Sequence, residues 1–579
     1  MTVPRYLGFA GEPRRLQRFL ARLVPDRHSS LQLNRDLDCD DLVIFTSPGT
    51  PSVRMLGDHG LIVGRLFANH VSCAPLPALD LESSIDAASS GGKSLLERHW
   101  GAYVAFIRDG GRIAVLRDPS AAVPAYHASI DGITVYFSDL AICSDLRLAD
   151  RDIDEEFLRQ WLTFPGLRTQ RTGLSGIFEL LPGSVHWLIG GETRIEAAWT
   201  PWSITRRRTF PSFEAAAKEV RSTAARTVAA QLRGCGPMVL CLAGGFDSAV
   251  VAAALANGGI FLPSLHVHMP SADPDAAAYA RAVARCLGVK MTETVLNDEV
   301  LDLRPEAGPA LRPMPDLIME PLVRVLCAYA VENGAHGFVT GGSGTSLFCG
   351  LTAAATITDA WRTSGPWQAL IAARDAARRE GCSLSASILS MLRQRRFCER
   401  PPLWSGDQRF LAPAGIAAKI DSHPWLPSPR RSLPGKIEQV EALVRAQHDF
   451  EPAPRAGRAI VRPLMNQPML ELFLSIPTWM WTGGGRDRAV ARNAFEDRLP
   501  ALTKPPSAAG RRAGRATRAL EHNRTALTQL LLGGELGRRR LIRTDQVERC
   551  LRDPDPREED SARILHLASL ELWLRSRVP

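Results

Sequence analysis

The stretch that decides the fold is Cys241-Leu-Ala-Gly-Gly-Phe-Asp-Ser-Ala-Val-Val-Ala-Ala-Ala-Leu-Ala256. Residues 239–242 predict a short buried strand, and the alanine-rich run 248–255 predicts a helix. Gly244 and Gly245 join them without Cβ atoms, so backbone N–H groups can close on a ligand. The helix N-terminus adds unpaired N–H groups and partial positive charge. The segment predicts a pyrophosphate-binding turn, although a tight turn with a capping serine explains it about as well.

Two polar side chains begin that helix. Asp247 can hold a cation that bridges phosphate oxygens. Ser248 can donate its hydroxyl to a phosphate or cap the helix. The rest of the chain must therefore decide between a binding loop and a plain turn.

Length and composition describe a globular protein of several domains. A chain of 579 residues is too long for one compact core, and 45% hydrophobic with 23% charged residues is ordinary for a soluble protein. The best apolar run is broken by Asn257-Gly258-Gly259, so we expect no membrane span, and the N-terminus lacks a secretory apolar core. Eleven scattered cysteines without a C-x-x-C pair favour reduced thiols and a cytoplasmic location.

The formal net charge of +9 suits anionic ligands. Arginines cluster at 511–518 and 538–540, which solvated helical faces explain more readily than peptide or phosphate contacts. No basic stripe with interleaved aromatics is present, so we expect no nucleic-acid partner.

The chain divides into two predicted domains, 1–204 and 212–579, joined by a polar link. The first is β-rich, with its clearest strands at 61–67, 102–107, 113–116 and 133–137. The second alternates strands with helices: strands 239–242, 265–269 and 337–340, and helices 213–232, 275–287 and 322–331. Such alternation predicts a parallel sheet covered on both faces, with ligands at the carboxyl ends of its strands. The loops 244–248 and 341–344 both follow strands, so we expect them to flank one nucleotide pocket. Beyond residue 351 the pattern is mostly helical.

Several motifs together resemble the asparagine synthetase superfamily. In the second half the resemblance rests on Gly244–Ser248 and Thr340–Phe348. In the first half it rests on Arg117-Asp118-Pro119, Pro124-Ala125-Tyr126, Phe137-Ser138-Asp139, Leu181-Pro182-Gly183-Ser184 and Trp199-Thr200-Pro201. The implied fold class is α/β, with a β-rich glutaminase-like sandwich (Ntn type) before a PP-loop ATP pyrophosphatase-type parallel α/β domain that ends in helices.

Within that superfamily the chain is most similar to lasso-peptide macrolactam synthetases. The stretches that carry this likeness are Arg117–Pro124, Thr340–Cys349, Pro463–Pro468 with Pro477–Trp479, and Gly484–Ala489. The likeness implies that ATP adenylates an Asp or Glu side chain of a precursor peptide, which the peptide's own N-terminal amine then attacks. It also implies ATP and Mg²⁺ as cofactors, with a leader-peptide protease and a peptide-recognition protein as partners.

The resemblance also assigns site residues. Those implied for ATP are Leu242, Gly244, Gly245, Asp247, Ser248, Val267, Thr340, Gly341 and Gly342. Asp247 is the implied magnesium ligand. Asp247 and Ser248 are implied in catalysis, together with a lysine that stabilises the developing oxyanion, for which Lys504 is the candidate.

The chain departs from the family pattern at four positions. Ala243 stands where the family has serine, Thr345 where it has an acid, and Ala509 where it has the lysine. Lys504 reaches the site only if its loop is shifted, and a solvated loop lysine is the simpler interpretation; Arg511 and Arg512 are other candidates for that charge. Thr2 replaces the cysteine that releases ammonia from glutamine.

These departures leave other functions open. A synthetase-like protein that binds a peptide without turning over ATP is the main alternative. A glutamine-dependent asparagine synthetase is disfavoured by Thr2, and a tRNA-modifying enzyme by the missing paired cysteines. His266 and His268 alternate on a strand and can mimic a metal pair, but packing beside the nucleotide explains them better. Trp479 and Trp481 are interpreted as core or groove lining.

Overall fold

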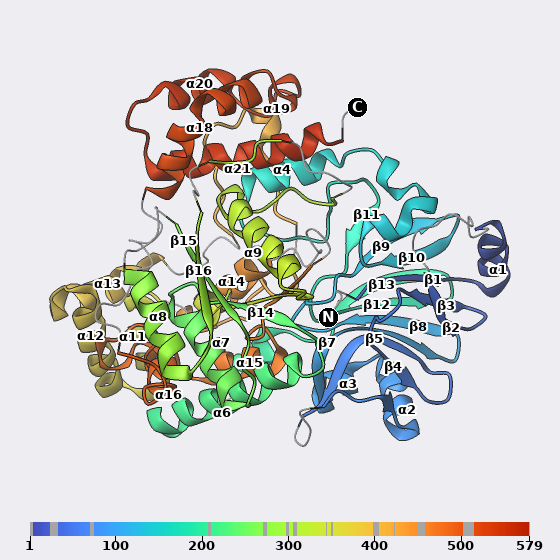
Figure 1. Cartoon of the computed structure of the whole chain (residues 1–579), viewed down its shortest axis with the longest axis horizontal. Coiled ribbons are helices and arrows are strands. Elements are labelled where there is room, and N and C mark those ends of the chain that lie inside the picture. Colours follow the sequence, from blue (N-terminus) through green and yellow to red (C-terminus); the bar gives the residue numbers. More distant parts are fainter. Residues whose placement is uncertain are drawn as a thin grey trace.

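Two antiparallel-type sheets and one parallel sheet form the framework of the computed structural model (Figure 1). The structure describes residues 4–23, 33–69, 74–206, 210–269, 275–296, 300–304, 310–342, 344–348, 351–397, 404–421, 423–448, 458–501 and 514–577. In Figure 1 the sandwich lies on the right and the parallel sheet near the centre. The C-terminal helices lie above both.

The first two sheets pack face to face. One has the order β11-β9-β10-β1-β3-β2 and the other β13-β12-β8-β7-β5-β4-β6. Apolar side chains that alternate along each strand fill the space between them, including Tyr6 and Ile44 from one sheet and Val63 and Phe106 from the other. The strands are β1 (Tyr6–Ala10), β2 (Asn34–Asp38), β3 (Leu42–Thr46), β4 (Ser52–Met55), β5 (Gly60–Ala68), β6 (Ala78–Leu79), β7 (His99–Asp109), β8 (Arg112–Arg117), β9 (Tyr126–Ile130), β10 (Ile133–Phe137), β11 (Ile177–Glu179), β12 (Ser184–Ile189) and β13 (Glu192–Ala197).

Helices of this part are short. They are α1 (Pro13–Arg22), α2 (Leu81–Ser90), α3 (Lys93–Arg98), α4 (Glu155–Thr163) and α5 (Pro201–Thr205). The last two pack beyond the sandwich: α4 against the C-terminal helices and α5 against the core of the parallel half. Every strand pair in these two sheets is antiparallel except β4 with β6. The predicted β-rich sandwich is confirmed.

The third sheet is parallel throughout, in the order β16-β15-β14-β17-β18. Its strands are β14 (Met238–Cys241), β15 (Ser264–His268), β16 (Met291–Val295), β17 (Gly337–Thr340) and β18 (Ala459–Val461). Leu240 packs with α6 (Phe213–Leu232), α7 (Phe246–Asn257) and α8 (Asp275–Leu287), whereas Val239 packs with α9 (Glu320–Glu332) on the opposite face. Helices therefore cover both faces, as the alternation predicts.

Two strands of this sheet, β16 and β18, were not predicted from the sequence. β16 is an edge strand whose Met-Thr-Glu-Thr-Val sequence is mostly exposed, so it lacks the apolar run of a buried strand. β18 has only three residues and lies in a region that otherwise reads as helical. The helix after the first glycine loop begins at Phe246 rather than Ser248, because Gly245 is its N-cap.

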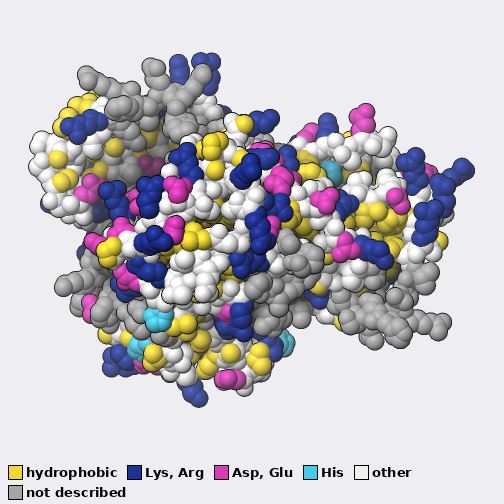
Figure 2. Space-filling view, turned by 90° about the horizontal axis from the view of Figure 1, so that it is seen from above, with side chains coloured by type: hydrophobic (Ala, Val, Ile, Leu, Met, Phe, Trp, Pro, Cys, Tyr) yellow, Lys and Arg dark blue, Asp and Glu magenta, His cyan; other side chains and the backbone are white. Residues whose placement is uncertain are grey.

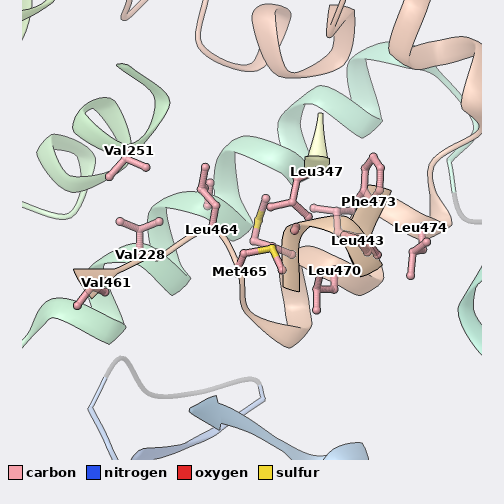
Figure 3. Packing of buried hydrophobic residues seen from close by; sticks show 14 of the residues in the cluster. Val228, Val251, Leu347, Leu443, Val461, Leu464, Met465, Leu470, Phe473 and Leu474 are labelled. Atoms are coloured by element: carbon pink, nitrogen blue, oxygen red, sulfur yellow. The ribbon is translucent and has the colours of Figure 1, made fainter. Parts of the chain in front are cut away.

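The remaining helices extend the core and add a bundle. Val228, Val251, Leu443, Phe473 and neighbouring side chains from α6, α7, α14 and α15 pack together in Figure 3. These later helices are α10 (Gly344–Leu347), α11 (Ala353–Ser364), α12 (Pro366–Glu380), α13 (Leu384–Phe397), α14 (Pro434–His448), α15 (Gln467–Ser475), α16 (Ala489–Ala494), α18 (Arg515–Leu532), α19 (Glu535–Arg538), α20 (Thr544–Arg552) and α21 (Glu558–Arg575). No helix in the described ranges is long and apolar enough to cross a membrane.

A buried ionic cluster joins the sandwich to the parallel half. Both oxygens of Glu179, at the end of β11, are held by arginines: Arg117 at 2.8 Å, Arg168 at 2.8 Å and Arg312 at 3.1 Å. All four side chains are buried. Burial alone would raise the pKa of Glu179, but the three guanidinium groups outweigh it and lower that pKa to about 2. Arg312 belongs to the segment before α9, so the cluster links the two parts of the chain.

The face seen in Figure 2 carries Lys and Arg side chains interspersed with Asp, Glu and hydrophobic groups. Charge on that face is mixed rather than gathered into one stripe. Such a surface is that of an ordinary globular protein.

Candidate active site

The first glycine loop has a backbone that only glycine adopts easily. Gly244 has a φ of +74°, and a Cβ there would lie 2.2 Å from the carbonyl oxygen of Ala276. Gly245 caps α7 without any side-chain bond to the first turn, so the first N–H groups of a 12-residue helix face the loop. The Ser248 hydroxyl donates to the Gly245 carbonyl at 2.9 Å. Ser248 is therefore not the helix cap, and its hydroxyl lies at the turn.

The second glycine loop closes directly on the first. A Cβ at Gly341 would lie 2.4 Å from the Ser248 nitrogen, and one at Gly344 would lie 2.7 Å from the Asp247 carboxyl carbon. The Gly342 N–H donates to the Thr340 hydroxyl at 3.1 Å, which holds the turn after β17. The structure thus brings the two loops into contact at the carboxyl ends of neighbouring strands.

Asp247 faces an arginine that the sequence analysis did not assign. Arg488 Nη1 lies 2.6 Å from Asp247 Oδ1, and both side chains are largely buried, at 5% and 15% exposure. Arg488 is the N-cap of α16 and has a φ of +59°, a conformation that non-glycine residues rarely adopt. An unusual backbone at a buried charge pair is typical of functional sites.

A second arginine from α16 lies beside the same loop. The Arg492 guanidinium sits 4.9 Å from the centre of the Phe246 ring. Burial lowers the pKa of Arg492, and the neighbouring Arg488 adds to that effect. In the sequence, Arg488 and Arg492 are four residues apart, a spacing that places both on one side of a helix and could have indicated a cationic site. The motif Gly484–Ala489 indicates the subfamily but assigns no role to either arginine. Two cations and a helix N-terminus together suit a polyanion.

Leu242 follows β14 and Val267 lies near the end of the adjacent β15, and their side chains pack on opposite faces of the sheet. The Leu242 side chain packs with α6 and α7, and that of Val267 packs with the α9 side. Both are buried. The Leu242 carbonyl shares a 2.8 Å hydrogen bond with Nδ1 of His266, which is itself buried. Their contact with an adenosine stays a prediction.

The two histidines of β15 have partners other than a metal. His268 Nε2 lies 2.5 Å from Glu293, which also pairs with Arg281 at 3.0 Å. Within the described ranges, no group of three or more His, Cys, Asp or Glu side chains is arranged to hold a metal ion.

Trp481 is buried against Phe348 and Phe473, so it belongs to the core beneath the second loop. Trp479 is partly buried and packs against the cluster formed by α11, α12 and α13. The contacts described for both indoles are core contacts, and none of them lines an open groove.

Several predicted residues lie outside the described residues. These are Thr2, Lys504, Ala509, Arg511 and Arg512. Thr345 belongs to the short helix α10, but its side chain is outside the description. The identity of the catalytic cation therefore stays a prediction.

A cavity separates the sandwich from the outer edge of the parallel sheet. Its volume is about 70 Å³, and its lining includes Arg65, Phe67, Gln447, Arg462 and Met465. Arg462 follows β18 and approaches Gly342 of the second loop, since a Cβ at that glycine would lie 3.4 Å from Arg462 Nε. Arg462 thus lies between this cavity and the second glycine loop.

Three solved structures have partial likeness to this chain. NMN synthetase from Francisella tularensis is 14% identical, with 23% of this chain and 57% of that chain covered and a TM-score of 0.17. U34-tRNA thiolase NcsA from Methanococcus maripaludis is 13% identical, with 36% and 89% covered and a TM-score of 0.18. Glutamine phosphoribosylpyrophosphate amidotransferase from B. subtilis is 10% identical, with 58% and 90% covered and a TM-score of 0.20. The match spans little more than half the length of the NMN synthetase, and overlaps this weak carry no argument.

Sequence comparison is more decisive. No curated protein matches the chain. A family model described as asparagine synthase matches residues 219–575, which is more than half of the chain and includes both glycine loops and Arg488. The chain therefore belongs to the asparagine synthase family, whose general chemistry is ATP-dependent amide formation.

Proposed function

We propose that this protein is an AMP-forming amide ligase that closes a macrolactam ring in a ribosomally made precursor peptide. The observation that carries the proposal is the contact between the two glycine loops around Asp247 and the N-terminus of α7. Arg488 and Arg492 add positive charge at the same point. This combination suits a triphosphate better than a neutral ligand.

The proposed chemistry has two balanced steps. A peptide carboxylate oxygen attacks the α-phosphorus of ATP, and the bond to the β,γ-phosphates breaks, which yields an acyl adenylate and pyrophosphate. The peptide's N-terminal amine then attacks the acyl carbon, loses a proton, and expels AMP. Because both groups belong to one peptide, the second step is intramolecular and gains from a folded, held substrate.

In this scheme the chain's own residues bind and orient the phosphates. The N–H groups of the first loop and of α7 would hold the pyrophosphate oxygens. Arg488 would pair with the same oxygens once the Asp247 carboxylate binds Mg²⁺. Asp247, which lies against Gly344 of the second loop, is the acid that would hold Mg²⁺, with phosphate oxygens as the other ligands. Bound Mg²⁺ would neutralise phosphate charge. Lys504 stays the candidate for the cation at the collapsing intermediate.

The peptide substrate rests on the subfamily motifs and on Thr2. A sandwich (1–204) without the ammonia-releasing cysteine fits a synthetase half (212–579) whose amine arrives with its substrate. We expect a leader-peptide protease and a peptide-recognition protein to deliver that substrate in the cytoplasm. Nucleic acid is not among the expected partners.

The test is to incubate the purified chain with ATP, Mg²⁺ and the precursor encoded beside its gene. We expect one AMP for each peptide that loses one water, and no product with Asp247→Ala. A peptide that stays linear while the parent chain binds it and binds ATP would contradict ring closure.

A second candidate is a peptide-binding scaffold that no longer turns over ATP. The observation favouring it is that Asp247 is already paired with Arg488, while Ala243 and Thr345 each remove a polar or acidic group of the family pattern. This reading predicts tight peptide binding without AMP release. Asparagine formation from glutamine is expected from neither candidate, so its detection would contradict both.

A further inference from the structure

The outer side of α11, α12 and α13 exposes large apolar side chains. Between 40% and 73% of each side chain is exposed, with Trp367 highest. The six residues are Trp361, Trp367, Leu370, Leu384, Leu389 and Leu392. We call this set the helical face. A patch of several large apolar groups on neighbouring helices commonly marks an interaction site.

The inner sides of the same helices already form a complete small core. Ala360, Ala369, Ala373 and Ala376 pack there with Met391. Alanines make up most of this core, beside Ile357 and Met391, while two tryptophans and four leucines of the same helices are exposed, which is unusual for side chains of that size. The six exposed side chains are not part of this core, so packing within the core does not explain why large apolar residues stand at these positions.

Helix geometry brings these side chains to one side. Trp367, Leu370, Arg374 and Arg378 follow one another at three- and four-residue spacing, which forms a single stripe along α12. Residues 381–383 alone connect α12 to α13, so the two helices run roughly antiparallel. Leu389 and Leu392, in the middle of α13, thus lie opposite the middle of α12. Figure 1 places these helices at the outer edge of the molecule.

Among the described side chains of these helices, the exposed charged groups are arginines, apart from Glu380. Arg362, Arg374, Arg378 and Arg393 are exposed. Among the acids, Asp359 and Asp375 are buried. Glu380 is exposed but pairs with Arg379 at 2.9 Å. The helical face is therefore apolar with a basic margin.

We propose that the helical face binds the surface of an anionic lipid bilayer. Tryptophan and leucine side chains insert at the headgroup boundary while arginines meet lipid phosphates, and this pairing of apolar and basic groups supplies both terms of peripheral binding. A second copy of this chain would place arginines against arginines. The two cavities described, one beside Arg65 and one beside Asp152, are lined by other parts of the chain.

Vesicle cosedimentation of the full chain tests this, independently of any ATP chemistry. The probes are phosphatidylcholine vesicles with and without about one-third phosphatidylglycerol. We expect binding to the anionic vesicles only, weakened by salt. Trp367→Glu with Leu370→Glu should abolish it. Arg374→Gln with Arg378→Gln, which leaves the apolar groups intact, should lower the partition coefficient about thirty-fold.

The matched control is Leu81→Glu with Ile85→Glu on α2, two apolar groups of similar exposure far from the helical face. It should bind vesicles like the parent. Failure of the parent to sediment, equal binding to neutral vesicles, or an equal loss in the α2 control would each overturn the proposal. If the parent ignores vesicles but the α12 variant slows ring closure, the face belongs to a protein partner and the lipid assignment is wrong. A Tm equal to the parent's shows that each variant is folded.

Discussion

At the scale of single residues, the Asp247 carboxylate has an observed partner, Arg488, and a proposed one, a magnesium ion, which compete for it. In the structure its carboxylate is paired with Arg488 at 2.6 Å. In the proposed reaction it holds a cation beside phosphate. A carboxylate that exchanges an arginine for a metal releases that arginine toward the same phosphates. The family motif predicts Asp247 as a site residue, but only the structure shows that its carboxylate is paired with Arg488.

Asp247→Ala should therefore abolish Mg-ATP binding, measured by calorimetry, because Asp247 is the acid that lies against Gly344 of the second loop, whereas the nearby Asp487 pairs with Arg488 Nε at 3.4 Å. Thr345→Asp should tighten binding by restoring a second acid. If Asp247→Ala binds Mg-ATP as well as the parent does, the loop has been misinterpreted.

Arg488→Met should slow AMP formation by about a hundred-fold, the usual scale for one preorganised donor at a developing charge. The matched control is Arg486→Met, since that arginine is exposed and only loosely paired with Glu496 at 3.6 Å. AMP release in the two variants is the measurement. Equal rates would remove Arg488 from the site.

At the scale of elements, the site depends on two strand–loop–helix units that fit without spare room. A Cβ at Gly341 would meet the backbone of α7 at 2.4 Å, and backbone cannot rotate away as a side chain can. The two loops can therefore approach this closely only because glycine, which has no Cβ, stands at these positions. Sequence patterns predict each loop, whereas the closeness of their fit depends on packing.

Gly341→Ala should lower the free energy of unfolding by about 1–3 kcal/mol, as overpacking does, and should weaken ATP binding. Gly533→Ala is the control, because its Cβ would meet only the Gln529 carbonyl at 3.9 Å. Denaturant unfolding and calorimetry on both variants give the comparison. A Gly341→Ala protein that matches the control would show that the loops do not interlock as described.

The elements also show where sequence reasoning succeeds and where it stops. Strands 239–242, 265–269 and 337–340 were predicted within one residue, because each has apolar residues bounded by turns or helical patterns. β16 and β18 were missed because an exposed edge and a three-residue strand carry no such run. Arg488 was missed because the pairing of Arg488 with Asp247 joins residues 241 positions apart.

At the scale of the whole molecule, the sandwich and the synthetase half are joined through buried charge. Glu179 neutralises part of the charge of three buried arginines, so its removal leaves that buried positive charge less compensated. The sequence motif around Arg117 predicted a segment of the sandwich but not this junction. The partner Arg312 lies 133 residues from Glu179.

Glu179→Gln should cost about 3 kcal/mol of stability at neutral pH. Since the folded pKa of Glu179 is lowered to about 2, its contribution is fully present above the ordinary glutamate pKa and is lost as pH falls toward 2. The variant should therefore lack this acid-dependent loss. Asp545→Asn, which breaks an exposed pair with Arg549, should change stability by less than about 1 kcal/mol. Unfolding curves from neutral pH downward are the measurement.

The central claim is that the joined glycine loops form a site that releases pyrophosphate from ATP when a peptide carboxylate is present. ATP–pyrophosphate exchange tests it most directly, because exchange requires adenylate formation and its reversal. We predict peptide-dependent exchange in the parent chain, retained in Ala509→Lys, which should also raise macrolactam yield about a hundred-fold. Asp247→Ala should show none. No exchange with the cognate peptide, in the parent or in Ala509→Lys, would contradict the account and favour the non-catalytic scaffold.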